Sequence, residues 1–139
     1  MNDPKQKAER LIENLRGIAA VRAEGVKEEE DGVSFQQTLE SSSSDMVPFL
    51  IPVLKDRPEG PDFRIQSDVR NLVAMALGSI GSESAVPALI QALQNDQDSG
   101  VRGNAVNALK KIGTLEARKA VQEYKAQGKK SITFDYVYL

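Results

Sequence analysis

The chain has 139 residues and a formal net charge of −2, a size that fits one domain. It contains no cysteine and no histidine, which excludes disulfide bonds, thiolate metal sites and catalysis of the Ser-His-Asp or Cys-His type. No apolar run reaches the roughly 20 residues of a membrane-spanning helix, and the N-terminus lacks the apolar stretch of a secretory signal. We therefore expect a cytoplasmic, non-enzymatic protein with no cofactor, no bound metal and no membrane contact.

The first predicted helix covers residues 5–21. Its apolar residues recur at helical spacing and form one stripe, made of Ala8, Leu11, Ile12, Leu15, Ile18 and Ala19. The acidic run 28–31 that follows is typical of an exposed loop. A short helix at 33–39 would turn Phe35 and Leu39 inward. We treat residues 1–45 as an irregular N-terminal unit.

A repeated pattern occupies the middle of the chain. Residues 69–81 recur 32 positions later as residues 101–113. Both segments contain a Val-Arg pair, an Ala-Leu pair and an Ile-Gly pair, namely Val69-Arg70 and Val101-Arg102, Ala76-Leu77 and Ala108-Leu109, Ile80-Gly81 and Ile112-Gly113. A second match joins 47–54 to 86–93 at an offset of 39, so the earlier unit carries seven extra residues within 55–67.

Each repeat predicts two helices, because its apolar residues follow helical spacing. One helical hairpin cannot bury its own apolar side, so hairpins must stack on one another. The sequence predicts an all-α protein: a right-handed α-solenoid of antiparallel helix pairs, with six or seven helices in a single domain. Its first clear unit is 46–81, which contains the inserted loop. A second unit at 82–113 and a half repeat at 114–130 follow, and a tail at 131–139 ends the chain.

Several residues have predicted structural roles within these repeats. Gly81 and Gly113 stand just after helices, where a left-handed backbone conformation ends the helix. Arg70 and Arg102 recur with the repeat period and are expected to form ion pairs between repeats with turn carboxylates such as Asp68, Asp96 and Asp98. The alternative role for the two arginines is binding of an anion.

The segment 68–113 resembles the HEAT-like repeats of the phycobilisome-lyase type. The family pattern is Val-Arg, then Ala-Leu-Gly-x-Ile-Gly, then Ala-Val-Pro-x-Leu-Ile-x-x-Leu, and then an Asp-rich turn, which Asp96 and Asp98 match. Lys110 departs from the pattern, because the family usually has glycine there. The family includes bilin-attaching lyases, phycobilisome-degradation factors and binding scaffolds. The resemblance implies a solenoid in which the second helix of each pair lines the concave side.

The second helices supply the candidate binding residues. On the predicted outward side lie Leu72 and Met75 of the first repeat and Asn104, Asn107 and Lys111 of the next. Leu72 and Met75 are apolar where a solvated surface would be polar. They either pack against the N-terminal region or form a patch that binds a partner protein.

The last nine residues contain three of the seven aromatic residues of the chain. Ile132, Phe134, Tyr136 and Tyr138 alternate with other residues, a spacing that predicts a short extended tail. The tail either folds back to cap the stack, docks on a partner's sheet or groove, or joins two copies of the chain in a homo-oligomer. Phe134, Tyr136 and Tyr138 are therefore candidate partner-binding residues.

The favoured function is a non-enzymatic protein-binding module or scaffold that uses the concave helical surface and the aromatic tail. The first alternative is a lyase-like or chaperone-like factor of a phycobilisome system, acting with a partner chain. The second is nucleic-acid binding, because residues 69–139 have a charge balance of +3. The balance of −5 in residues 1–68 and the scarcity of aromatic residues weigh against nucleic acid.

Overall fold

A computed structural model describes residues 3–23, 35–56 and 63–138. These residues form seven α-helices and two 3-10 helices and contain no strand, which confirms the all-α prediction. The elements in chain order are α1 (Pro4–Ala23), α2 (Phe35–Glu40), η2 (Ser44–Met46), α3 (Val47–Lys55), α4 (Phe63–Ile80), η3 (Glu83–Ala85), α5 (Val86–Asn95), α6 (Ser99–Ile112) and α7 (Leu115–Tyr138).

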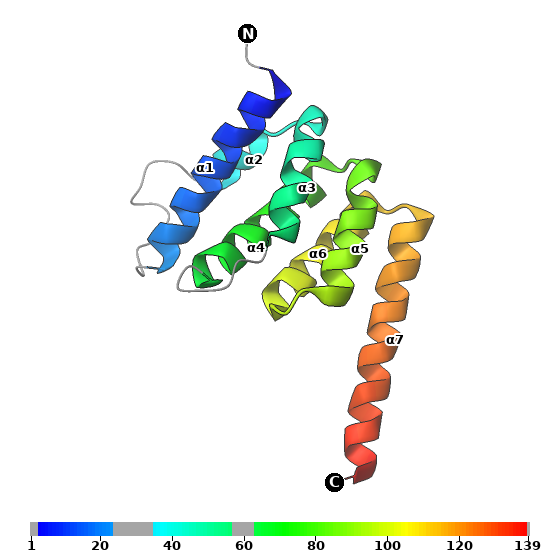
Figure 1. Ribbon diagram of the computed structural model, residues 1–139. Coiled ribbons are helices and arrows are strands. Elements are labelled where there is room, and N and C mark those ends of the chain that lie inside the picture. The colour runs from blue at the N-terminus through cyan, green and yellow to red at the C-terminus, as the bar shows by residue number, and fades with distance from the viewer. Residues whose placement is uncertain (1–2, 24–34, 57–62, 139) are drawn as a thin grey trace.

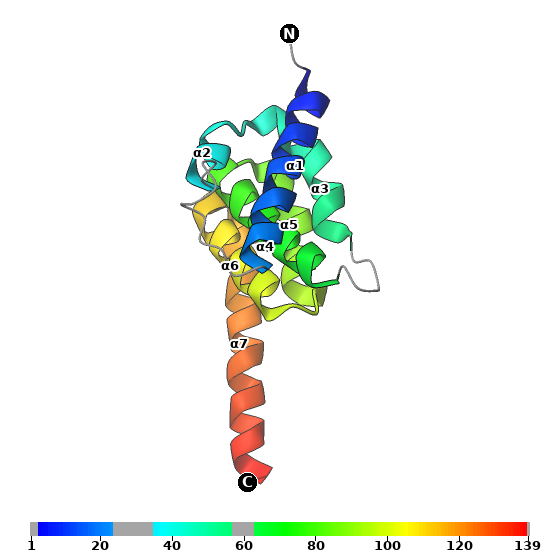
Figure 2. The same ribbon diagram turned by 90° about the vertical axis from the view of Figure 1, so that its left-hand side faces the viewer.

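The helices stack in two layers (Figures 1 and 2). Helices α3 and α5 form one layer, and α2, α4 and α6 form the other. The pairs α3–α4 and α5–α6 are antiparallel hairpins, and α4 packs extensively against α6. Helix α1 closes one end of the stack by packing against α4 and α3, while α7 packs against α5 and α6 at the other end. No described helix has both the length and the apolarity to cross a membrane.

Helix ends in the repeats follow from local sequence. Pro48 and Pro87 lie in the first turns of α3 and α5, where the missing amide hydrogen removes no helical hydrogen bond. Asp98 caps α6, because its carboxylate accepts a hydrogen bond from the amide of Val101 at 3.1 Å. Gly81 and Gly113 follow α4 and α6 with φ angles of 75° and 72°, a left-handed conformation that favours glycine.

The core is continuous from α1 to α7. All six residues of the stripe predicted for the first helix are buried in it. Phe35 of α2 is also buried, as predicted, and the guanidinium carbon of Arg22 lies 5.8 Å from the centre of its ring. Leu39 is half-buried against the same core. The acidic run 28–31 lies outside the described residues.

Part of the seven-residue insertion lengthens a helix. Helix α4 has 18 residues, whereas its counterpart α6 has 14, and the additional residues are at the N-terminal end of α4. The other three inserted residues belong to the link between α3 and α4, of which residues 57–62 lie outside the described residues.

The two repeats approach each other closely at Gly78 of α4. A β-carbon added there would stand 2.7 Å from the α-carbon of Ala108 and 2.9 Å from its β-carbon. Only glycine therefore lets α4 and α6 pack at this separation. Lys110 occupies the position in α6 that is equivalent to Gly78, and its side chain is exposed.

The extended C-terminal tail is a wrong prediction. Helix α7 continues to Tyr138 and projects beyond the other helices, so the chain does not fold back to cap the stack (Figure 1). A helix that has already formed gains one hydrogen bond for each residue that it adds, whereas a lone extended segment leaves its backbone groups unpaired. The side chains of Phe134, Tyr136 and Tyr138 lie outside the described part of the chain, and their roles in docking or self-association stay predictions.

Replacing Gly78 with alanine is expected to lower the free energy of unfolding by about 1–3 kcal/mol, because the new methyl group overlaps the backbone of α6. Gly17 is the matched control: it lies inside α1, is exposed, and a β-carbon added to it would meet nothing within 4 Å. Gly17→Ala should raise the free energy of unfolding by about 0.5–1 kcal/mol. Urea titrations of the two variants measure both effects. A change of the same sign in the unfolding free energy of both variants would contradict the close approach of α4 and α6 at Gly78.

Candidate partner-binding site

A buried ion pair fixes α4 to the turn before α6. Nε of Arg70 donates to Oδ2 of Asp96 at 2.9 Å, and Nη2 of Arg70 donates to Oδ1 at 3.2 Å. Both side chains are almost completely buried. Arg70 also donates to the hydroxyl of Ser67 and to the carbonyl of Asp56, which satisfies more of its five hydrogen atoms. The structure thus places Arg70 and Asp96 together between repeats.

The carboxylate of Asp96 also organises its own turn. Its Oδ1 accepts a hydrogen bond from the amide of Asp98 at 3.0 Å, one residue before α6 begins. Arg102 lies in the same turn and donates to the carbonyls of Asp96 and Gln97 at 2.7 and 3.0 Å. The two repeat-related arginines therefore act differently. Arg70 connects two repeats through the carboxylate of Asp96, whereas the side chain of Arg102 stabilises the turn by binding backbone carbonyls of the turn.

Two asparagines connect α4 and α6 at the edge of their contact. Asn104 donates from Nδ2 to Oδ1 of Asn71 at 2.8 Å, and Asn71 donates to the carbonyl of Ser67 at 3.0 Å. The sequence predicts that Asn104 contacts a partner. Its side chain is only partly exposed, and one of its donors is held by the neighbouring repeat.

Leu72 does not belong to a binding surface. Its side chain is 1% exposed and lies in the core, because α1 packs directly against α4. A partner therefore cannot reach Leu72 in this structure, which contradicts its place among the partner-binding candidates. Met75, one turn further along α4, is 37% exposed.

A pocket of about 340 Å³ opens on the layer formed by α2, α4 and α6. Four of the predicted candidates line it: Met75, Asn104, Asn107 and Lys111. The remaining lining residues come from the same three helices and are Leu39, Gly78, Ala108 and Lys110. The structure therefore brings Met75 together with three candidates that lie 29 to 36 positions later in the sequence.

Small residues explain why the pocket exists. Gly78 and Ala108 meet where α4 and α6 approach closely, and neither has a side chain large enough to fill the surface above this contact. The thioether of Met75 and the half-buried Leu39 supply the apolar walls. The result is an apolar pocket with two amides and two lysines among its lining residues.

A family model for HEAT repeats matches residues 47–130, which is more than half of the chain. The chain belongs to the HEAT-repeat family. No curated protein and no solved structure matches the chain significantly. The matched segment runs from α3 into α7 and so includes both helical hairpins. This match does not extend to the phycobilisome-lyase subtype.

In this HEAT-repeat stack, the sequence patterns do not identify the residues that shape the pocket. The helical spacing predicts an inward Leu39, and the repeat pattern alone accounts for Gly78. A signal for the pair was present, because Gly78 and Ala108 occupy facing positions of consecutive second helices and are both small. Lys110 was recognised as a departure from the family pattern, but its place in the pocket lining depends on the three-dimensional arrangement. Within the described residues, no group of three or more Asp or Glu residues could hold a metal ion.

Replacing Arg70 with methionine is expected to lower the free energy of unfolding by about 3–5 kcal/mol, because Asp96 would remain buried without its partner. Arg102→Met is the matched control, with an expected loss of about 1 kcal/mol, because its described bonds go to neutral carbonyls at a partly exposed position. Chemical denaturation of both variants provides the comparison. Equal losses of unfolding free energy would show that the ion pair with Asp96 stabilises the fold no more than the hydrogen bonds of Arg102 do.

The double variant Arg70→Met with Asp96→Asn separates the ion pair from simple loss of packing. Removal of both charges should cost much less than the sum of the two single changes, because neither charge is left alone in the core. Additive losses would contradict a direct interaction between the two side chains.

Proposed function

We propose that this HEAT-repeat chain is a non-enzymatic protein-binding module that holds its partner on the outer surface of α2, α4 and α6. The observation that carries the proposal is the pocket of about 340 Å³ that Met75, Asn107 and Lys111 line together. Small-molecule pockets have volumes of about 300–1,000 Å³ and combine apolar walls with a few polar groups. This pocket has the same composition at the small end of that range, which suits one or two side chains of a partner protein. HEAT repeats are also commonly interaction scaffolds.

The pocket is suited to binding because its walls are already ordered. Two of its three helices are fixed to each other by the Arg70–Asp96 bridge, the asparagine pair and the contact at Gly78. A partner would therefore bind without first ordering the surface, and little conformational entropy would be lost. Met75 supports the same function, because methionine adapts to differently shaped apolar groups.

Site-specific photo-crosslinking tests the proposal. A photoreactive benzophenone amino acid placed at Met75 should crosslink to a partner in lysate from cells that express the chain, because Met75 is exposed in the pocket. The same amino acid at Gln91, which is exposed on α5 in the other layer, is the matched control. Crosslinks of equal yield at both positions, or at Gln91 alone, would contradict binding at the pocket.

The identity of the crosslinked partner also tests a narrower role. The resemblance of 68–113 to phycobilisome-lyase repeats supports a lyase-like or chaperone-like factor that acts together with a partner chain. A phycobiliprotein or a bilin-carrying protein attached at position 75 would favour that role, and a partner without pigment would favour the general scaffold.

A further inference from the structure

We propose that the pocket on α2, α4 and α6 binds an acidic peptide segment of the partner, with one apolar side chain of that segment inserted between Met75 and Leu39. This inference rests on the proposed function, because it names the kind of partner that the same pocket accepts. Three properties of the lining carry it: its apolar interior, its charge and its exposed amide.

The interior of the pocket fits an apolar side chain. Gly78 and Ala108 are buried and provide a floor without polar side chains, and Met75 and Leu39 stand beside it. Burial of apolar area contributes roughly 25 cal/mol per Å², so an inserted leucine, methionine or phenylalanine would supply a large part of the affinity. The volume of about 340 Å³ is at the small end of ligand pockets, which limits the insertion to one or two side chains.

The charge of the lining selects acidic neighbours for that side chain. Lys110 and Lys111 both line the pocket and are exposed, and none of the described lining residues is a carboxylate. Lys110 is present where the preceding repeat has Gly78, so this positive charge is a property of the second hairpin. Complementary charge raises association rates and suppresses binding of like-charged partners. Aspartate or glutamate next to the inserted side chain would satisfy both lysines.

The amide of Asn107 fits a peptide backbone. Asn107 is exposed in the lining and offers two hydrogen-bond donors and one acceptor, which match the carbonyl and amide groups of an extended or helical segment. Asn104, one turn earlier in α6, is held by Asn71 and so gives this edge of the pocket a fixed shape.

The same lining disfavours nucleic acid. Single-stranded nucleic acids bind where basic grooves combine with aromatic side chains on which bases stack. The described lining residues include no aromatic ring and only two cations. An acidic polymer without apolar groups would satisfy the lysines and leave the apolar interior empty.

The test uses the whole chain and four fluorescent peptide probes, with fluorescence anisotropy as the readout. The first probe carries one leucine flanked by aspartates and glutamates. In the other three, the leucine is replaced by serine, the acidic residues by glutamine, or the acidic residues by lysine. A polythymidine oligonucleotide is the competing polyanion. We expect the acidic leucine probe to bind most tightly and the serine probe to lose about tenfold or more in affinity.

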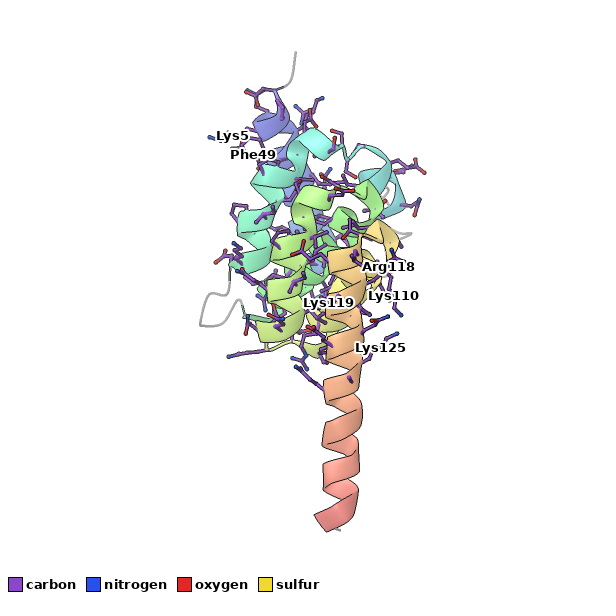
Figure 3. All side chains as sticks on the ribbon, turned by 90° about the vertical axis from the view of Figure 1, so that its right-hand side faces the viewer. Lys5, Phe49, Lys110, Arg118, Lys119 and Lys125 are labelled. Carbon is purple, nitrogen blue, oxygen red and sulfur yellow. The ribbon has the colours of Figure 1, made fainter. Side chains whose placement is uncertain are left out.

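The decisive variants reverse charge inside and outside the pocket. Lys110→Glu together with Lys111→Glu should weaken binding of the acidic leucine probe by about tenfold or more. Lys5→Glu together with Lys119→Glu makes the same change in net charge on α1 and α7, at exposed lysines that do not line the pocket, and should change the affinity by less than about twofold (Figure 3). Circular dichroism verifies that both double variants remain folded.

Three results would overturn the inference. One is no binding of the acidic leucine probe, another is equal binding of the neutral or basic probes, and the third is lysine-dependent binding of the oligonucleotide that exceeds that of the peptide. If crosslinking at Met75 still captures a partner, only the acidic peptide is wrong and the protein-binding function stands. If crosslinking at Met75 also fails, the proposed function is wrong as well.

Discussion

The arrangement of the repeats depends on the buried ion pair between Arg70 and Asp96. A charged pair inside a protein is favourable only when good geometry and further hydrogen bonds offset the loss of hydration. Here both carboxylate oxygens accept from the guanidinium group, and Ser67, Asp56 and the amide of Asp98 provide the additional bonds. These bonds form together only when α4, the end of α3 and the α5–α6 turn have one relative position, so the pair selects that position over a shifted one.

The pocket is a by-product of the same packing. The ion pair and the asparagine contact keep α4 and α6 together, and glycine and alanine make that close contact sterically allowed. Residues small enough for such an approach leave the outer surface hollow. The hollow is then bordered by longer side chains from α2, α4 and α6, which include Met75 and the two lysines. The residues that hold α4 and α6 together and the residues that line the pocket are thus neighbours on the same two helices.

Features that depend on local periodicity could be predicted from the sequence. The stripe of α1, the helix-ending glycines and the two hairpins all follow from spacings that are fixed by the geometry of a helix. Leu72 could not be assigned, because a repeat pattern says which side of a helix faces the next repeat and does not say that α1 packs directly against α4. The alternating pattern in 131–139 predicts an extended segment, and this prediction is wrong. The pattern is local, whereas a helix that has already formed extends readily into the residues that follow it. The pocket required distances between helices, which a sequence does not contain.

Hydrogen exchange of the native chain tests most directly whether α4 and α6 form one cooperative unit. Amides that share the highest protection should lie in α4 and α6, and Arg70→Met should lower the protection of both helices by the same free energy, although the substitution lies in α4 alone. If α6 keeps its protection while α4 loses it, the two repeats unfold independently and the ion pair does not connect them.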